Sequence, residues 1–179
     1  MAAATDDSGT PMVPVWDRFV RVFHWSLVGL IAAAWLTEDA KRVHIWIGYT
    51  VLALVAARLV WGVVGSRHAR FADFVAGPAR VLGYLRDLVR GQERRYLGHN
   101  PAGGAMIVAL LATILVTCVS GWLMGTDRFW GSELMEGIHE TAATLILVLV
   151  AAHVAGVVWE SLHHGENLVR AMITGRKRA

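Results

Sequence analysis

Long apolar stretches separated by polar segments are the main feature of the chain. A helix that crosses the hydrocarbon core of a bilayer needs about 20 mainly apolar residues. All four prolines lie outside the apolar stretches, as expected for uninterrupted helices, because proline removes a backbone hydrogen bond. The pattern predicts a bundle of four membrane-spanning helices, at residues 20–36, 44–64, 105–124 and 138–159.

The polar connection between the second and third spans contains a further periodic pattern. It begins at Gly77 and Pro78, a pair typical of a helix start. Apolar residues then recur at helical spacing, and charged residues occupy the other faces. The apolar set is Val81, Leu82, Leu85, Leu88 and Val89, and the charged set is Arg80, Arg86, Asp87 and Arg90. We predict a short helix in the cytoplasmic interface, with its arginines toward lipid headgroups. A helix that docks a partner protein is the alternative.

Composition agrees with a membrane protein of one domain. The chain has 179 residues, of which 55% are hydrophobic and only 17% are charged, whereas soluble domains have about 25% charged residues. Its mean hydropathy is +0.47. Residues 1–12 are acidic and lack the basic and apolar regions of a secretory signal, so we expect a disordered tail before a domain at 13–179. The single cysteine, Cys118, excludes a disulfide framework and a cysteine-based metal cluster.

Basic residues are distributed unevenly between the two sides of the predicted bundle. One side carries Arg18, Arg21, Arg67, Arg70, Arg80, Arg86, Arg90, Arg94, Arg95, Arg176, Lys177 and Arg178. The other side carries Lys41, Arg42 and Arg128, mixed with Glu38, Asp39, Asp127, Glu133 and Glu136. The positive-inside rule therefore predicts a multi-pass membrane protein with both termini in the cytoplasm. Positive charge that flanks spans indicates a lipid surface and excludes a nucleic-acid partner.

Four histidines lie in or at the edge of the spans, where ionisable residues are costly and point to function. Because successive spans run in opposite directions, His24 and His153 fall near the inner side, and His44 and His139 fall near the outer side. His139 and His153 are 14 residues apart, which is about 21 Å along a helix and within about 40° of the same face. The sequence thus predicts two levels with two histidines each.

Two histidines at each level match the axial ligands of a six-coordinate haem iron, whereas zinc requires three or four ligands in one place. We therefore predict a bundle that holds two non-covalent b haems. Such iron transfers electrons, because no position is left for oxygen or substrate. A membrane scaffold whose histidines bond only to backbone is the alternative, and it would be colourless.

Two arginines are candidates for binding the haem propionates. Arg58 is 14 residues after His44, so it lies on nearly the same face at the inner level, and Arg21 lies one turn before His24. A buried arginine needs a negative partner. For Arg58, a side chain that extends to the inner interface is an equal alternative.

Several motifs resemble those of the prokaryotic cytochrome b561 family, which includes the b-type subunits of nickel-iron hydrogenases and the gamma subunits of formate dehydrogenases. The resemblance extends over nearly the whole chain from Val13. The motifs are WDRFVRVFHW, HIWIGY, RLVWG, YLGHNPAGG, HETAATLILVLVAAHVAG and ENLVRAMITGRKR. Hydrogenase-linked members are often longer, and the GHNP loop is more similar to that of stand-alone cytochromes b.

The resemblance implies a function in a respiratory chain of the bacterial inner (cytoplasmic) membrane. It pairs His24 with His153 and His44 with His139 as haem ligands. It also implies electron exchange with ubiquinone or menaquinone near the cytoplasmic haem, and with a periplasmic c-type cytochrome or hydrogenase-like protein. The positions that match the quinone loop of formate dehydrogenases are His99, Asn100 and Gly103, for which a tight interfacial turn is the alternative.

Two questions about activity and assembly stay open in the sequence. Some compact members of the family oxidise superoxide at the outer face and reduce quinone, so a superoxide oxidase is the alternative function. The protein is then an enzyme, a quinone oxidoreductase, rather than an electron carrier alone. A homodimer is also compatible with the sequence, in addition to the lipid, quinone and redox-protein partners.

Overall fold

A computed structural model describes residues 11–179 of the chain. Residues 1–10 of the predicted tail lie outside this range. The described end of that segment is part of a strand, because Met12 pairs with Arg178 near the other terminus.

Four long helices form the body of the molecule, and all four are long and apolar enough to cross a membrane. The predicted all-α membrane bundle is therefore confirmed. The helices are α1 (Arg18–Leu36), α2 (Lys41–Val64), α5 (Pro101–Met124) and α6 (Glu133–His163). With 31 residues, α6 is about 46 Å long, so it extends beyond a hydrocarbon core of about 30 Å.

Three of the four long helices begin earlier than their apolar stretches, at polar side chains that cap them; α2 also begins earlier but has no side-chain cap. Asp17 accepts a hydrogen bond from the backbone N–H of Val20 at the start of α1. Asn100 and Ser132 cap α5 and α6 in the same way. The apolar pattern thus marks the part of each helix that fits the membrane, whereas the caps determine where α1, α5 and α6 begin.

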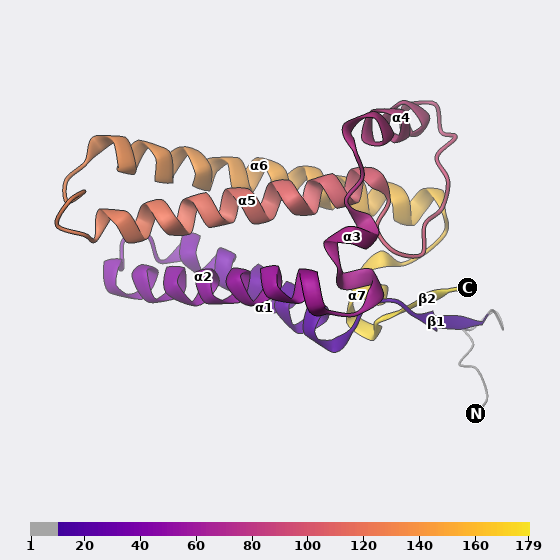
Figure 1. The fold of residues 1–179 in the computed structure, drawn as a ribbon, viewed down its shortest axis with the longest axis horizontal. Helices are drawn as coiled ribbons and strands as arrows, with labels where there is room; N and C mark the ends of the chain where they lie inside the picture. Colours follow the sequence, from indigo (N-terminus) through magenta and orange to yellow (C-terminus); the bar gives the residue numbers. More distant parts are fainter. Residues whose placement is uncertain (1–10) are drawn as a thin grey trace.

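The bundle consists of two helical hairpins, α1 with α2 and α5 with α6 (Figure 1). A small core joins all four helices, with Phe23, Val51, Val55, Leu111 and Ile146 among its members. Most other apolar side chains face outward, as expected for helices surrounded by lipid. Both termini lie at one end of the bundle, here called the termini end, and the hairpin connections lie at the opposite turn end (Figure 1).

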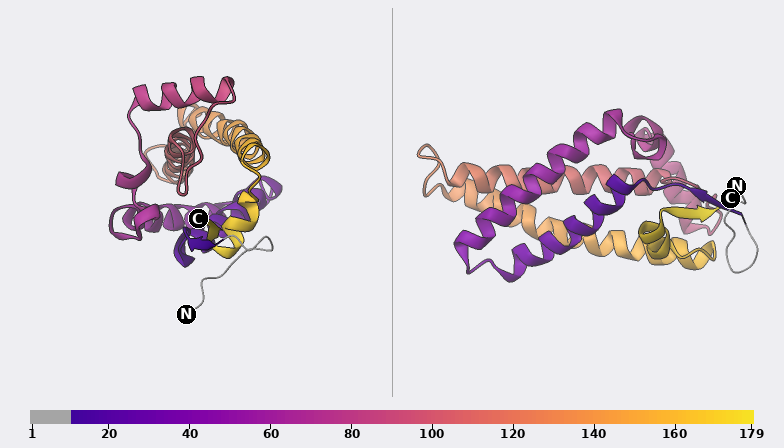
Figure 2. Two further views of the ribbon diagram at one scale, coloured as in Figure 1. Left: turned by 90° about the vertical axis from the view of Figure 1, so that its right-hand side faces the viewer. Right: turned by 90° about the horizontal axis from the view of Figure 1, so that it is seen from below.

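The shorter elements all gather at the termini end, where α4 lies across the bundle (Figure 2). Helix α4 occurs where a short amphipathic helix was predicted, with Pro78 in its first turn. It buries Tyr84 against the bundle and leaves Val89 88% exposed. These elements are η1 (Arg67–Ala69), α3 (Phe71–Phe74), α4 (Pro78–Val89), α7 (Leu168–Thr174), β1 (Met12–Pro14) and β2 (Arg176–Arg178).

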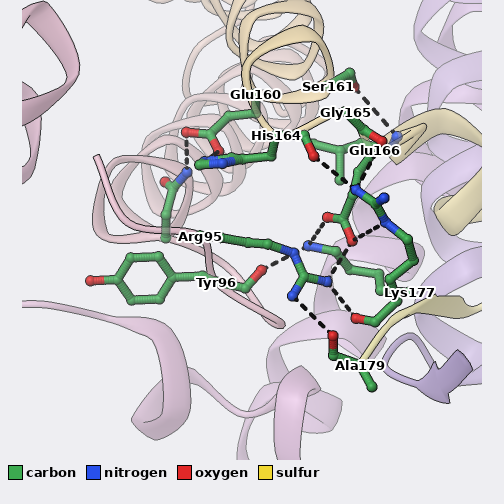
Figure 3. Close-up of polar contacts among 12 residues, drawn as sticks. Arg95, Tyr96, Glu160, Ser161, His164, Gly165, Glu166, Lys177 and Ala179 are labelled. Carbon is green, nitrogen blue, oxygen red and sulfur yellow. Dashed lines mark hydrogen bonds and ion pairs between the residues drawn. The ribbon is translucent and has the colours of Figure 1, made fainter. Parts of the chain in front are cut away.

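The C-terminal segment is folded back onto the bundle, an arrangement that the sequence analysis did not predict. Strand β2 pairs with β1 in antiparallel register. The Lys177 side chain is 5% exposed, lies 3.2 Å from Glu166 and donates to the carbonyl of Tyr96 (Figure 3). Arg95 binds Glu166 at 2.6 Å. Burial raises the pKa of Glu166, but the hydrogen bonds and positive charges of Arg95 and Lys177 outweigh it, and the net pKa lies below the ordinary value.

Candidate functional site

The structure brings His44 and His139 together near the turn end. Their ring centres are 6.1 Å apart and their planes are at 69°. Each ring donates its Nδ1–H to a backbone carbonyl, from His44 to Ala34 at 3.0 Å and from His139 to Thr117 at 2.9 Å. These bonds fix the tautomer, so Nε2 of both rings is the nitrogen that can bind a metal.

Helix α5 also shapes the position of the His139 ring. Gly121 lies against it, and a Cβ atom there would be 3.0 Å from Cε1 and 3.1 Å from Nδ1. The Ser120 hydroxyl lies 3.4 Å from Nδ1. Sequence reasoning missed these contacts and the two carbonyls, because a glycine or a backbone oxygen carries no signal of its own in a membrane helix.

The other two histidines of the spans meet nearer the termini end. The ring centres of His24 and His153 are 6.4 Å apart, with an angle of 52° between the planes. Nδ1 of His24 is buried and has no hydrogen-bond partner within residues 11–179. The four histidines thus form the two pairs that their depths in the sequence predict, and their role as ligands remains a prediction.

Both pairs have the spacing that an iron held between two imidazoles requires. Two metal–nitrogen bonds of about 2 Å, plus about 1.1 Å from each nitrogen to its ring centre, give about 6.2 Å. The observed distances are 6.4 Å and 6.1 Å. Gly48 and Gly156 lie close in sequence to His44 and His153, and a Cβ atom at either glycine would meet nothing within 4 Å. The backbone at both glycines is therefore open on the side where a Cβ atom would lie. Residues 11–179 contain no group of three or more histidine, cysteine or acidic side chains that suits zinc.

Arg58 and Arg21, the arginines predicted to bind the haem propionates, each have one buried N–H group without a partner in the described part of the chain. Arg58 is 3% exposed, donates from Nη2 to the carbonyl of Ala69 at 3.0 Å and packs over Phe71, but its Nη1 is unsatisfied. The bond to Ala69 directs the side chain toward the segment that follows α2, so both interpretations of Arg58 stay predictions. Arg21 donates to the carbonyl of Ile173 at 2.5 Å, and its Nε is unsatisfied.

Asn100 and Gly103, two of the predicted quinone-site residues, form the cap of α5. The Asn100 side chain accepts from the Gly103 N–H at 2.7 Å and donates to Glu160 at 2.8 Å. The structure therefore contains the tight turn that was the alternative interpretation. A turn and a ligand site are compatible, so the quinone role stays a prediction.

His99, the third predicted quinone-site residue, is enclosed by aromatic rings. Its ring centre lies 4.5 Å from that of Trp16 and 4.8 Å from that of Phe74. Its Nδ1 is buried without a partner among the residues that the structure describes. Burial, followed by the positive charges of Arg58 and Lys177, lowers the pKa of His99 to about 3. His99 is therefore a neutral ring at physiological pH.

Four membrane helices that enclose facing histidine pairs are the arrangement of a membrane-bound cytochrome b. Comparison with known families agrees with this class, because the family model for prokaryotic cytochrome b561 matches residues 15–175. The chain therefore belongs to the prokaryotic cytochrome b561 family. It is an electron-transfer protein with b-type haem and several membrane spans.

Two similar proteins carry the description "Probable Ni/Fe-hydrogenase B-type cytochrome subunit". The one from Rhizobium leguminosarum bv. viciae is 23% identical over 212 residues, which cover 92% of this chain and 88% of the relative. The one from Rhodobacter capsulatus is 22% identical over 214 residues, which cover 92% of this chain and 81% of the relative.

Proposed function

We propose that the protein conducts electrons across the membrane through two b haems, each held by one histidine pair. The observation that carries the proposal is the spacing of the two pairs, 6.4 Å for His24 and His153 and 6.1 Å for His44 and His139. The pairs lie at levels about 21 Å apart along α6. Haem supplies reversible one-electron chemistry when bound, and histidines on both faces leave the iron no open position.

The residues around each pair have different tasks in this proposal. At the turn end, Ala34 and Thr117 hold the rings of His44 and His139 in one orientation through their carbonyls. At the termini end, the unsatisfied N–H groups of Arg58 and Arg21 are donors for the carboxylates of the haem propionates. A propionate would also neutralise the buried Arg58 charge, which has no carboxylate partner closer than 4 Å within residues 11–179.

The distribution of charge supports an orientation with the termini end in the cytoplasm of a bacterium. The quinone would then exchange electrons near the His24–His153 level, where His99, Asn100 and Gly103 lie in the loop that begins α5. A periplasmic redox protein would dock at the turn end, near Glu133 and Glu136.

The names of the two relatives support a hydrogenase-like redox partner on the periplasmic side. The matched regions extend over 212 and 214 residues, whereas this chain has 179. The relatives thus contain insertions that this chain lacks. A smaller partner, such as a c-type cytochrome, fits the shorter connections equally well.

The haem-to-protein ratio of the purified protein tests the proposal. We expect two non-covalent b haems per chain by pyridine haemochrome. Replacing His24 or His153 by alanine should remove one haem, and replacing His44 or His139 should remove the other. His68→Ala is the matched control, because His68 pairs with Asp73 outside the bundle. A wild-type protein with one haem or none would contradict the proposal.

Charge reversal at Glu133 and Glu136 tests the docking surface. The double change should slow electron exchange with an acceptor c-type cytochrome at low salt, because electrostatic steering depends on ionic strength. Unchanged exchange with every periplasmic candidate would refute this surface.

A further inference from the structure

A largely buried carboxylate at the termini end joins three elements of the fold. Glu160, near the end of α6, accepts hydrogen bonds on Oε1 from the Tyr84 hydroxyl of α4 and from the Asn100 amide at 2.8 Å. Its other oxygen, Oε2, lies 3.3 Å from Nε2 of His164 (Figure 3). The side chains of Glu160 and His164 are only 15% and 14% exposed. No part of the haem-binding arrangement above uses this pair.

The position of Glu160 on α6 links it to the inner histidine level. It lies seven residues after His153, which is about 10 Å along the helix and about 20° short of two full turns. Glu160 therefore lies on the same face of α6 as His153, between that histidine and the aqueous side. It is also bonded to Asn100, in the loop where the proposed quinone site lies.

The chemistry of the pair differs from that of the histidine levels. An iron with two histidine ligands exchanges electrons only. A carboxylate can accept a proton from a substrate, and an imidazole can pass a proton on, as general bases and acids do. A substrate that uses both must exchange electrons together with protons, and hydroquinones and quinones are the membrane-soluble class that does so.

We propose that Glu160 and His164 are the proton-exchange pair of the quinone site. The inference rests on the proposed function, in which the quinone exchanges electrons at the His24–His153 level. Tyr84 and Asn100 orient the carboxylate, and His164, at the C-terminal cap of α6, connects it to the aqueous side.

The surroundings of Glu160 suit this task. Tyr84 stays a neutral donor, because burial, its hydrogen bond to Glu160 and nearby negative charge raise its pKa above the ordinary value. The other titratable groups near Glu160 are Tyr96, Glu93, His163 and Lys177. Lys177 pairs chiefly with Glu166, at 3.2 Å. The ionisable side chain beside Oε2 of Glu160 is therefore that of His164.

In the oxidising direction, the substrate is a hydroquinone and the products are a quinone, two electrons and two protons. The electrons would pass one at a time to haem bound at the His24–His153 level. The two O–H bonds of the hydroquinone break, and each proton in turn forms an O–H bond on the Glu160 carboxylate. The imidazole of His164 takes that proton at Nε2 and loses one from its other ring nitrogen to water. Quinone reduction uses the same steps in reverse.

Stopped-flow reduction of the haem-loaded protein by decylubiquinol tests the pair. Glu160→Gln keeps an oxygen that accepts from Tyr84 and Asn100, but it removes the carboxylate. We expect haem reduction to slow on the order of 100-fold and to lose its pH dependence, since general base catalysis contributes factors of this size. Reduction by dithionite and the haem-to-protein ratio should stay unchanged. Glu160→Asp should recover part of the rate.

Two further variants make the result specific. Glu93→Gln is the matched control, because Glu93 is a buried carboxylate whose hydrogen bond comes from Trp159 and whose neighbouring imidazole, at 3.6 Å, is that of His163. It should keep the wild-type rate. His164→Gln leaves both hydrogen bonds of Glu160 intact and should slow haem reduction by decylubiquinol. If Glu160→Gln does not assemble, this variant tests the proton-exchange pair in its place.

The results distinguish a failure of the Glu160–His164 pair from a failure of the proposed quinone function. If wild-type haem is neither reduced by decylubiquinol nor oxidised by decylubiquinone, the quinone function itself is wrong and the pair is wrong with it. If the wild type reacts and the Glu160 and His164 variants react equally fast, only the pair is wrong. An equal loss of rate in Glu93→Gln would also overturn the pair, because any buried carboxylate would then suffice.

Discussion

Substituting Gly121 by alanine should disturb the haem site at the turn end and leave the other site intact. The new Cβ atom would be 3.0 Å from Cε1 of His139, whereas carbon atoms in contact prefer about 3.5 to 4.0 Å. The ring therefore has to move by about half an ångström. This movement stretches the 2.9 Å hydrogen bond from Nδ1 to the carbonyl of Thr117.

The expected size of the effect follows from the role of that hydrogen bond. Loss of a partner that orients a metal ligand weakens metal binding by about 10- to 100-fold, which corresponds to about 1.4 to 2.7 kcal/mol. The helix itself should not suffer, because alanine favours a helix over glycine by about 1 kcal/mol. Gly121→Ala thus alters the position of the His139 ring without destabilising the helix.

The assay combines the haem-to-protein ratio, the electron paramagnetic resonance spectrum and a redox titration. We expect one low-spin signal and one midpoint potential to change, or one haem to be lost, while the other haem is unaffected. Gly137→Ala is the matched control, because it gives α6 the same gain in helix propensity and its Cβ meets nothing within 4 Å. If Gly121→Ala keeps both haems with wild-type spectra and potentials, the proposed ligand role of His139 is wrong.

Three further predictions concern the C-terminal fold, acid stability and the alternative function. Lys177→Met should lower the free energy of unfolding by at most about 3 kcal/mol, because it breaks a buried pair while Arg95 still binds Glu166; an unchanged melting temperature in detergent would refute this. The pKa of His99 falls from 6.5 to about 3 on folding, so as pH decreases between these values only the unfolded state gains a proton. Stability should therefore decrease over this range, by up to about 1.4 kcal/mol per pH unit, and His99→Leu should remove that part of the slope in urea titrations. Superoxide should reduce the haem far below the diffusion limit, because acidic residues surround the few cations of the turn end; a stopped-flow rate near that limit would instead favour a superoxide oxidase.

The membrane bundle was predictable because it depends on local properties of the chain. The length of an apolar stretch and the position of prolines determine whether a segment can span a bilayer. Gly77, Pro78 and the spacing of the following leucines predicted α4. Even the pairing of His24 with His153 follows from alternating helix direction, without any knowledge of packing.

The helix ends and the folded C-terminus were not predictable to the same degree. Asp17, Asn100 and Ser132 act as caps only where the neighbouring backbone leaves their oxygens in reach of free N–H groups. Lys177 looked like part of a basic tail, and its burial against Glu166 depends on contacts between distant parts of the chain. Charge counting cannot distinguish such a residue from an exposed one.

The sequence by itself determined how many helices cross the membrane, where the histidines lie in depth and which end is basic, because hydropathy and helical rise act along one chain. The tertiary structure decided which ring nitrogen of His44 and His139 is free, which glycine packs against the His139 ring and which carboxylate lies between His153 and the termini end. These features arise where side chains of one helix meet the backbone or side chains of another. Their distances depend on how the helices pack together, which no single segment specifies.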